Sequence, residues 1–502
     1  MGKFTNGVKS LIGSRHTVGS AMTAVIIAVV VVFNAVIYAL TALIGIYTDP
    51  TEEYDLSISG NTDHLFEEAQ LLGKQVRIIF CQAEDEVALH DTGKYVQATA
   101  REFAERYDFI KIEYYNILTE ADKLVQYKGD GKLLSSSVIF ECDGNFKTVT
   151  DVQSSAGYAD FYSLNSSGLP DAYIGEEFVG SMISWVLHTE HKKVYFTENH
   201  GEIADYSFGT LLRCAGYDFD PYKPESFTVN LSKTPVPDDC DLLIISSLTT
   251  DFEKPAEGAN VRTERDRLTD YLDKGGSLYV SIDPYGNSLP VLEGVLKDYG
   301  IEIASGLDAD GRVTRHIVKE SSESVYTDGL TFMAGYSEGE ISGAILSDME
   351  RYGSGRVLIS QSGVLKLSGE AKPLLKSSNS SVSYLADEII DRDGGYTVAA
   401  YSETKGDDGK EGKIFVVPSI YLTAGNVLIK PETANKDFSY ALLSRLFGAA
   451  TATYGTSSIV FKTNTLNGFT IGNARVYTAI IMSLPVILAI VGAVTVIKRK
   501  NR

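Results

Sequence analysis

Proline is scarce in this chain, at 13 of 502 residues, and charged residues make up only 22% of it. Disordered chains are typically rich in charge and poor in apolar residues. Here 44% of the residues are hydrophobic, so the chain is expected to fold. At roughly 100–200 residues per domain, its length predicts about three structural units.

Basic residues are also in deficit, with 45 Lys and Arg against 66 Asp and Glu, which gives a net charge of −21. Binding to nucleic-acid phosphates needs a cationic surface. The composition therefore excludes DNA or RNA as the expected partner.

Charged side chains are absent from residues 17–48 and from residues 476–497. As a helix, the 22 residues of the second stretch would reach about 33 Å, close to a hydrocarbon core of about 30 Å. Buried core helices rarely run this long without a charge, so both stretches are predicted to cross a membrane. Pro485 would kink the second span, which membrane helices tolerate.

The two tails, residues 1–16 and 498–502, carry three and four basic residues and no acidic ones. The positive-inside rule then predicts a two-pass protein of the cell membrane with both termini cytoplasmic. Because the tails hold seven positive charges, the net charge of −21 leaves −28 on residues 49–475, which are expected outside. A cleavable signal peptide is the alternative for the first span, but its apolar stretch is too long for one.

The chain has only four cysteines, and it contains no Cys-x-x-Cys pair. A zinc or redox motif is therefore not supported. Four extracytoplasmic cysteines allow two disulfides in three pairings, but large domains rarely need them. The sequence therefore favours four free, buried thiols, and disulfide formation is kept as the alternative.

The periodicity predicts two extracytoplasmic α/β domains. In domain one, residues 49–190, VRIIF, IKIEYYNI and SSVIFEC are expected strands, and FVGSMISWVLHT is a closing helix. In residues 191–455, KVYFT, DLLIISS and SLYVSI alternate with helices, which predicts a doubly wound, mostly parallel sheet. An inserted lobe is expected near residues 305–390. It is followed by two expected strands that complete the sheet, YTVAAYS and KIFVVPS, and a linker is expected over residues 456–475.

Common catalytic motifs are missing as well. The sequence has no GxxxxGK[ST] loop to hold nucleotide phosphates, no HExxH helix, and no GxSxG expected to form a nucleophile elbow. His188 and His191 have neither zinc nor triad spacing and are expected to be surface polar groups. We therefore predict that the chain is not an enzyme and that it binds neither a cofactor nor a metal ion.

Ligands of doubly wound sheets collect at the carboxyl ends of the parallel strands. Polar residues at these ends form the candidate ligand site, and we expect them exposed in loops. The alternative is structural, because Asp-Pro is a common turn and His200 would cap a helix. The candidate residues are Glu198, Asn199, His200, Glu202, Ser246, Asp283 and Tyr285.

The segments YDLS, VYFTENHGE, DLLIISS, YLDKGGSLYVSIDP, LPVLEGVLKDYGI and LPVILAIVGAVTVIKRK occur in this order between and within the two predicted spans. Together they resemble the GldG-type auxiliary proteins of ABC transporters, a family named for bacterial gliding motility. The family usually has Gly-His-Gly-Glu where this chain has Asn199, His200, Gly201 and Glu202. The resemblance implies a glutamine-amidotransferase-like sheet without its nucleophile.

The resemblance also implies an accessory subunit that works beside a separate ABC permease and a separate ABC ATPase. Its partners would be these subunits and the lipid bilayer, with a small polar or polysaccharide ligand as a further candidate. Two other functions stay open. One is a surface-anchored hydrolase that uses His200, Glu202 and Asp283, and the other is an extracytoplasmic ligand-binding protein independent of a transporter.

Overall fold

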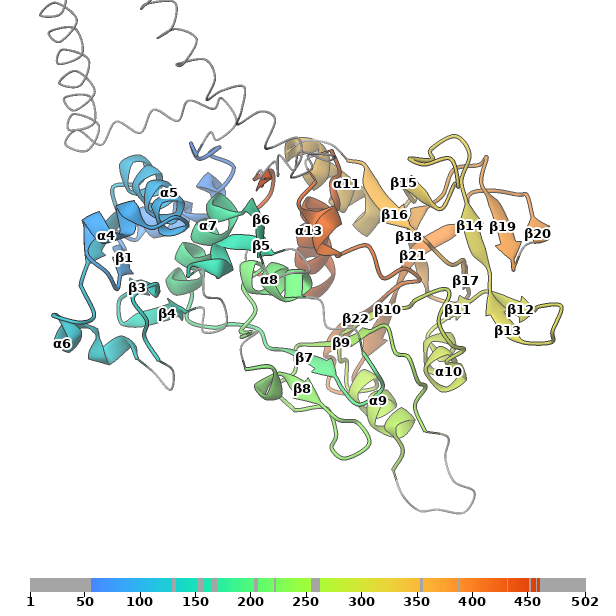
Figure 1. Cartoon of the computed structure of the whole chain (residues 1–502). Helices are drawn as coiled ribbons and strands as arrows, with labels where there is room; N and C mark the ends of the chain where they lie inside the picture. The colour runs from blue at the N-terminus through green and yellow to red at the C-terminus, as the bar shows by residue number, and fades with distance from the viewer. Residues whose placement is uncertain are drawn as a thin grey trace, which may run out of the picture. The chain divides into compact units, whose positions relative to one another are not determined.

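The computed structural model describes residues 56–128, 132–150, 157–164, 169–202, 206–220, 223–253, 262–352, 355–386, 388–430, 432–450, 453–456 and 458–460. Both predicted membrane spans and both tails lie outside these residues. The described residues belong to one compact unit that begins at Leu56, and their fold is mixed α/β (Figure 1). None of the helices in this described part is both long and apolar enough to cross a bilayer.

The N-terminal part is built on a four-stranded sheet in the order β2-β1-β3-β4. Strand β1 is parallel to β2 and antiparallel to β3. Helix α5 buries Val96, Ala100 and Phe103, the face that the sequence periodicity predicts. The elements are β1 (Val76–Phe80), β2 (Ile110–Tyr114), β3 (Val138–Cys142), β4 (Asn145–Val149), α3 (Glu67–Leu71), α4 (Glu84–Leu89), α5 (Gly93–Arg106) and α6 (Ala121–Leu124).

The larger sheet has 11 strands, and nine of them follow the path β16-β15-β18-β21-β22-β10-β9-β7-β8. The strands from β8 to β22 on this path pair in parallel, as predicted, and the others pair antiparallel. The sheet is therefore mixed, and the expectation of a mostly parallel sheet is wrong. The parallel strands are β7 (Val194–Thr197), β8 (Thr228–Val229), β9 (Leu242–Ser246), β10 (Leu278–Ser281) and β22 (Glu411–Val417).

The antiparallel half contains much of the stretch that was expected to be an inserted lobe. Strands β15 (Thr331–Tyr336), β16 (Val357–Ser360) and β18 (Lys372–Lys376) continue the large sheet through β21 (Thr397–Lys405). Strand β17 (Leu365–Leu367) joins β21 to β11 (Ile301–Ile303). Outside this sheet lie α11 (Glu340–Tyr352), the hairpin β12 (Ser305–Leu307) and β13 (Val313–Arg315), and the small sheet of β14 (Ile317–Lys319), β19 (Val382–Leu385) and β20 (Glu388–Asp391).

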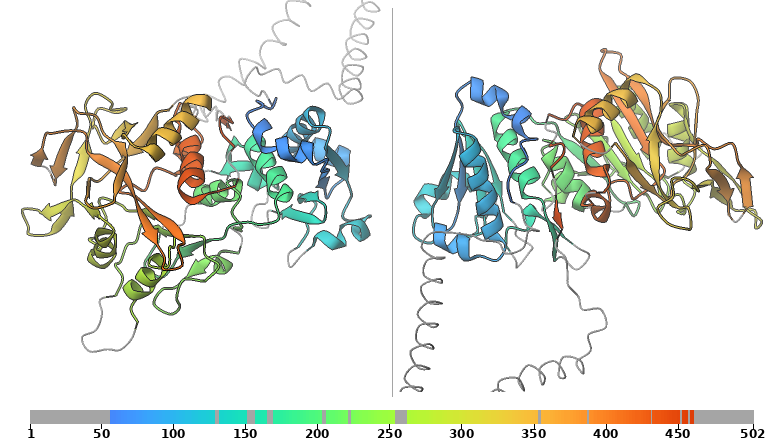
Figure 2. Two further views of the ribbon diagram at one scale, coloured as in Figure 1. Left: turned by 180° about the vertical axis from the view of Figure 1, so that it is seen from behind. Right: turned by 90° about the horizontal axis from the view of Figure 1, so that it is seen from above.

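Both faces of strand β9 are buried, which explains its unbroken apolar sequence. Leu242 and Ile244 pack into the core on one face, while Leu243 and Ile245 pack into the core on the other. Helices cover each face (Figure 2). They are α8 (Tyr206–Cys214) and α13 (Asn435–Phe447) on the first face, and α9 (Glu264–Leu272) and α10 (Pro290–Asp298) on the second.

Helix α7 (Gly175–Leu187) joins the two sheets. Twelve of its residues are buried, because it contacts β3 and β4 on one side and α8 on the other. A helix that is apolar all round is buried all round. The same apolar core therefore runs from Phe66 in the N-terminal part to Phe447 at the end of α13.

The last described strand returns to the N-terminal part. Strand β23 (Ile459–Val460) pairs with β6 (Pro170–Tyr173), which pairs with β5 (Tyr162–Leu164). These residues of β23 fall in the stretch expected to be a linker. All four cysteines are buried and free of disulfides, so the favoured prediction is confirmed.

Candidate functional site

The carboxyl ends of β7, β9 and β10 meet at one edge of the sheet, as the sequence predicts. Ser246 lies opposite Ser281 in the register of β9 and β10. The loop after β7 reaches the loop after β9, since the Thr249 amide donates to the His200 carbonyl over 2.9 Å. The structure thus brings the predicted loops together.

His200 is buried rather than exposed in this cluster. Its side chain is 8% exposed, and Nε2 lies 2.7 Å from Oε1 of Glu264, whose side chain is 2% exposed. The other carboxylate oxygen of Glu264 accepts from the Glu253 amide over 2.8 Å. The ring of Phe252 packs edge-on against the imidazole. The expectation of an exposed His200 is wrong, because Glu264, the first residue of α9, closes over it.

The loop that follows β7 also contains Glu198, Asn199 and Glu202. The His200 amide donates to Oε2 of Glu202 over 2.8 Å, while Oε1 of Glu202 has no hydrogen-bond partner among the described residues. Glu198 and Asn199 are exposed. Asn199 has a φ of +90°. Asparagine enters the region of positive φ more readily than most other residues do.

Asp283 and Tyr285 belong to a turn that Arg315 stabilises through hydrogen bonds. Oδ1 of Asp283 accepts from the Tyr285 amide over 2.9 Å, and the Tyr285 side chain is exposed. Arg315, which is buried, donates to the Asp283 carbonyl over 2.8 Å and pairs with Glu293 at 2.7 Å. Partial burial and the Asp283 charge raise the pKa of Tyr285. Sequence reasoning missed Arg315, which lies in a short hairpin with no motif.

This edge of the sheet offers hydroxyl and carboxylate groups for polar contact. Ser246, Asp283 and Tyr285 are at least partly exposed there. The imidazole of His200 is held by Glu264 instead of facing them. The arrangement suits hydrogen bonding to a polar ligand better than general-base catalysis, which needs a base within reach of the reacting group.

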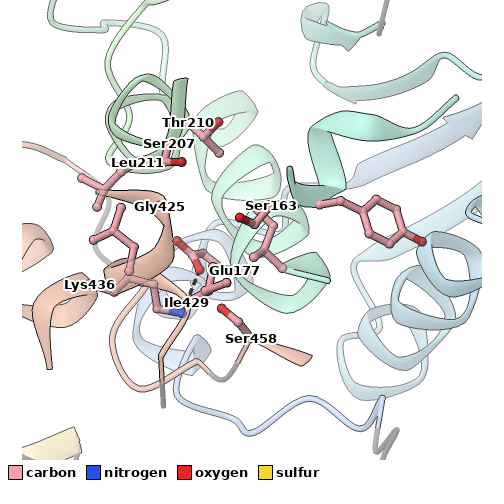
Figure 3. Close-up of a pocket in the computed structure, with 12 residues that line it drawn as sticks. Ser163, Glu177, Ser207, Thr210, Leu211, Gly425, Ile429, Lys436 and Ser458 are labelled. Atoms are coloured by element: carbon pink, nitrogen blue, oxygen red, sulfur yellow. Dashed lines mark hydrogen bonds and ion pairs between the residues drawn. The ribbon is translucent and has the colours of Figure 1, made fainter. Parts of the chain in front are cut away.

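A second group of residues lines a small cavity between α7, α8, α12 (Gly425–Leu428) and α13, with a volume of about 40 Å³. Figure 3 shows Glu177 and Lys436 pointing toward each other there. Lys436 Nζ lies 2.8 Å from Oε2 of Glu177 and donates to the Thr456 carbonyl over 2.6 Å. The Tyr440 hydroxyl donates to the other Glu177 oxygen. We call Glu177, Lys436, Tyr440 and Thr456 the junction.

Burial disfavours the charged form of Lys436, but attraction to Glu177 and Asp437 outweighs it. The pKa of Lys436 is therefore raised above its usual value of 10.5. Burial raises the pKa of Asp437, against the attraction of Lys436. The junction is a closed ion pair with hydrogen-bonded neighbours, the arrangement in which a buried pair is tolerated.

The first and last described segments both attach beside the junction. The Ser59 hydroxyl donates to Glu176 over 2.6 Å, and the Asn61 amide side chain donates to the Gly455 carbonyl over 3.0 Å. The Gly455 amide in turn donates to Asp437 over 3.0 Å. Segments nearly 400 residues apart thus lie side by side. Sequence reasoning missed this junction, because no local pattern links residues so far apart.

His191 is half-buried instead of being a simple surface group. Its ring stacks on Trp185 with centroids 3.7 Å apart and an angle of 5° between the planes. Nδ1 of His188 lies 2.8 Å from the Ser184 carbonyl. Within the described ranges, no cluster of His, Cys, Asp and Glu is arranged to hold a metal ion.

One GxSxG spacing occurs at Gly335–Gly339, which begins in the last two residues of β15 and ends just before α11. In a nucleophile elbow the serine hydroxyl is exposed at the end of its strand. Ser337 is buried instead, and its hydroxyl has no hydrogen-bond partner in the described part of the chain. The segment therefore lacks the exposure of an elbow.

No family model matches the chain, and no curated protein matches it either. Nine chains of solved structures are similar to it. The mmIFT52 N-terminal domain has 14% identity and a TM-score of 0.35, over 50% of this chain and 96% of that one. A ThuA-like protein from Bacteroides uniformis has 11% identity and a TM-score of 0.30, over 54% and 94%. A cytoplasmic protein from Salmonella typhimurium has 12% identity and a TM-score of 0.29, over 51% and 98%.

Proposed function

We propose that the protein is a membrane-anchored, non-catalytic accessory subunit of an ABC transport system. Its extracytoplasmic part would bind a substrate, the cell envelope or a partner subunit. The observation that supports this proposal most is the convergence of the first and last described segments, where Asn61 contacts Gly455.

The predicted spans are tethered to this point by short segments. Residues 49–60 separate the first span from Asn61, and residues 461–475 separate Val460 from the second span. An extended chain covers at most about 3.3–3.6 Å per residue. Each span would therefore enter the bilayer within about 40–55 Å of the described residue next to it. Two helices cannot enclose a polar path, so a multispan permease would have to supply it.

The non-catalytic part of the proposal rests on the partners of the strand-end groups. His200 is bonded to Glu264, and Asp283 holds the Tyr285 turn. The hydrolase alternative needs these same groups free to reach a substrate. We further infer that the parallel half of the sheet is of the doubly wound, glutamine-amidotransferase-like type, since helices cover both faces of β9.

The test is purification of the tagged full chain in a mild detergent. We expect an ABC permease and an ABC ATPase to co-purify with it, and the separated chain to hydrolyse no ATP. Small residues allow close helix approach. The Gly492→Leu/Ala493→Leu variant should lose both partners, and the matched Val494→Leu variant should keep them.

Two results would contradict the proposal. One is repeated recovery of the chain without either subunit. The other is hydrolase activity of the purified chain toward a cell-wall or sugar substrate that is lost in His200→Ala, which would favour the enzyme alternative.

A further inference from the structure

A cavity of about 110 Å³ lies at the amino ends of β9, β10 and β22. This is the edge of the sheet opposite the strand-end cluster. Cys240, Gly276 and Lys410, which immediately or closely precede these three strands, contribute to its lining. A single water needs about 10–15 Å³ by this measure. The cavity therefore has room for several waters or for a small polar group.

Positive charge exceeds negative charge in this cavity. Its lining has four basic residues, Arg262, Arg267, Lys274 and Lys410, and two acidic ones, Asp238 and Asp270. Arg262 pairs with Asp270. This local excess is the reverse of the balance of the whole chain, whose net charge is −21.

Three of the basic groups are available to a ligand. Arg267 donates one hydrogen bond, from Nη1 to the Leu231 carbonyl. Within the described residues, the side chains of Lys274 and Lys410 form no ion pair or hydrogen bond. The carboxyl end of α9, which is the negative end of its helix dipole, also lies at this cavity, and the positive charge of Lys274 offsets it. The positive charges of Arg267 and Lys410 are not offset in this way, so the cavity keeps an excess of positive charge.

The backbone holds two of these cations beside each other. Gly275 has a φ of +75°, and a Cβ at this position would lie 2.2 Å from the Lys410 carbonyl oxygen. Glycine thus allows the segment that carries Lys410 to pack directly against the end of α9. Lys274 and Lys410 are brought to one rim of the cavity by this close contact.

We propose that the cavity binds a compact oxyanion, either a phosphate or the carboxylate of a uronic acid. The guanidinium of Arg267 offers planar N–H donors that suit both anions, and the two lysines add point charges. Pro235 and Pro237 provide an apolar wall on the same cavity for a sugar ring. This inference does not depend on the transporter proposal, since it concerns only the extracytoplasmic part.

The test measures binding of inorganic phosphate and of glucuronate to the full chain in detergent, by isothermal titration calorimetry at low salt. We expect saturable binding of at least one anion, weakened by added salt. The Lys274→Gln/Lys410→Gln variant should raise the dissociation constant at least tenfold. Both lysines are exposed, so this variant should keep the thermal unfolding temperature of the unaltered protein.

The matched control is Lys111→Gln/Lys366→Gln, which removes two exposed positive charges elsewhere on the surface. It should bind as the unaltered protein does. Binding of phosphate alone assigns the site to phosphate, and binding of glucuronate alone assigns it to a uronic acid. The proposal is overturned if neither anion binds saturably, or if the two double variants lose affinity equally.

Discussion

The pair of His200 and Glu264 makes the strand-end cluster partly structural. Replacing Glu264 with Ala would leave the imidazole and the Glu253 amide without their acceptor. A buried polar group left unpaired costs about 1–3 kcal/mol. We expect urea denaturation to show a loss of about 2–4 kcal/mol for Glu264→Ala. The exposed Glu198→Ala should stay within about 0.5 kcal/mol, and equal stability of the two variants would contradict the buried pair.

Trp185, the only tryptophan of the chain, reports on its stacking partner His191. Burial and the charge of Lys147 lower the pKa of His191 below 6.5, although Asp218 opposes them. The folded protein therefore binds this proton more weakly than the unfolded chain does. The free energy of unfolding should fall as the pH drops below 6.5.

We expect the fluorescence of native Trp185 to titrate with a midpoint below pH 6.5. The transition should disappear in His191→Gln, because this variant removes the titrating ring. A midpoint above 6.5, or a transition that survives the substitution, would show that the assignment is wrong.

The four cysteines should be inert in the folded protein. Burial raises the pKa of Cys81, Cys214 and Cys240 to about 12, and that of Cys142 to about 11. The thiolate is the reactive form. At pH 8 a chromogenic disulfide reagent should label no thiol in the native protein and four in urea. Fewer than four in urea without reductant would reveal a disulfide.

Helices α7 and α13 are tied by the ion pair of Glu177 with Lys436. Removal of one partner leaves an unpaired buried charge, which costs about 3–5 kcal/mol. We expect this loss of stability for Lys436→Met. The double variant Glu177→Gln/Lys436→Met should recover most of it, because it leaves no buried charge at this pair.

A double-mutant cycle in urea measures this coupling. The pair Lys193 and Asp239 serves as the control, since both side chains are largely exposed and surface pairs contribute at most about 1 kcal/mol. If the cycles for the two pairs give the same coupling, the junction does not tie the helices.

For the whole molecule, the charge asymmetry predicts that residues 49–475 lie outside the cell membrane. A cysteine introduced at Asp310, which is exposed in the β12–β13 turn, should react with an impermeant maleimide in intact cells. A cysteine at Asn501 should react only after permeabilisation. Labelling of Asn501 but not Asp310 in intact cells would reverse the topology.

Several strands of the two main sheets, among them β1, β3, β7, β9 and β10, could be predicted from the sequence alone. The unbroken run of β9 predicts a strand buried on both faces, and Leu242 and Leu243 do pack on opposite faces. Gly275 follows the end of α9 with a φ of +75°, which glycine adopts without steric cost. These features depend on periodicity and backbone conformation, which neighbouring residues encode.

Which distant residues share a site could not be predicted from the sequence, because it depends on how the whole chain packs. Sequence reasoning placed His200 near the strand ends but could not place Glu264 against it, 64 residues along the chain. It also missed Glu177 with Lys436, which are 259 residues apart. The pairing of β15, β16 and β18 into an antiparallel half of the sheet was likewise undetermined. A buried charge can pair with any opposite charge, and the edge of a strand can pair with any other strand. The packing of the whole chain determines which of these partners lies close enough.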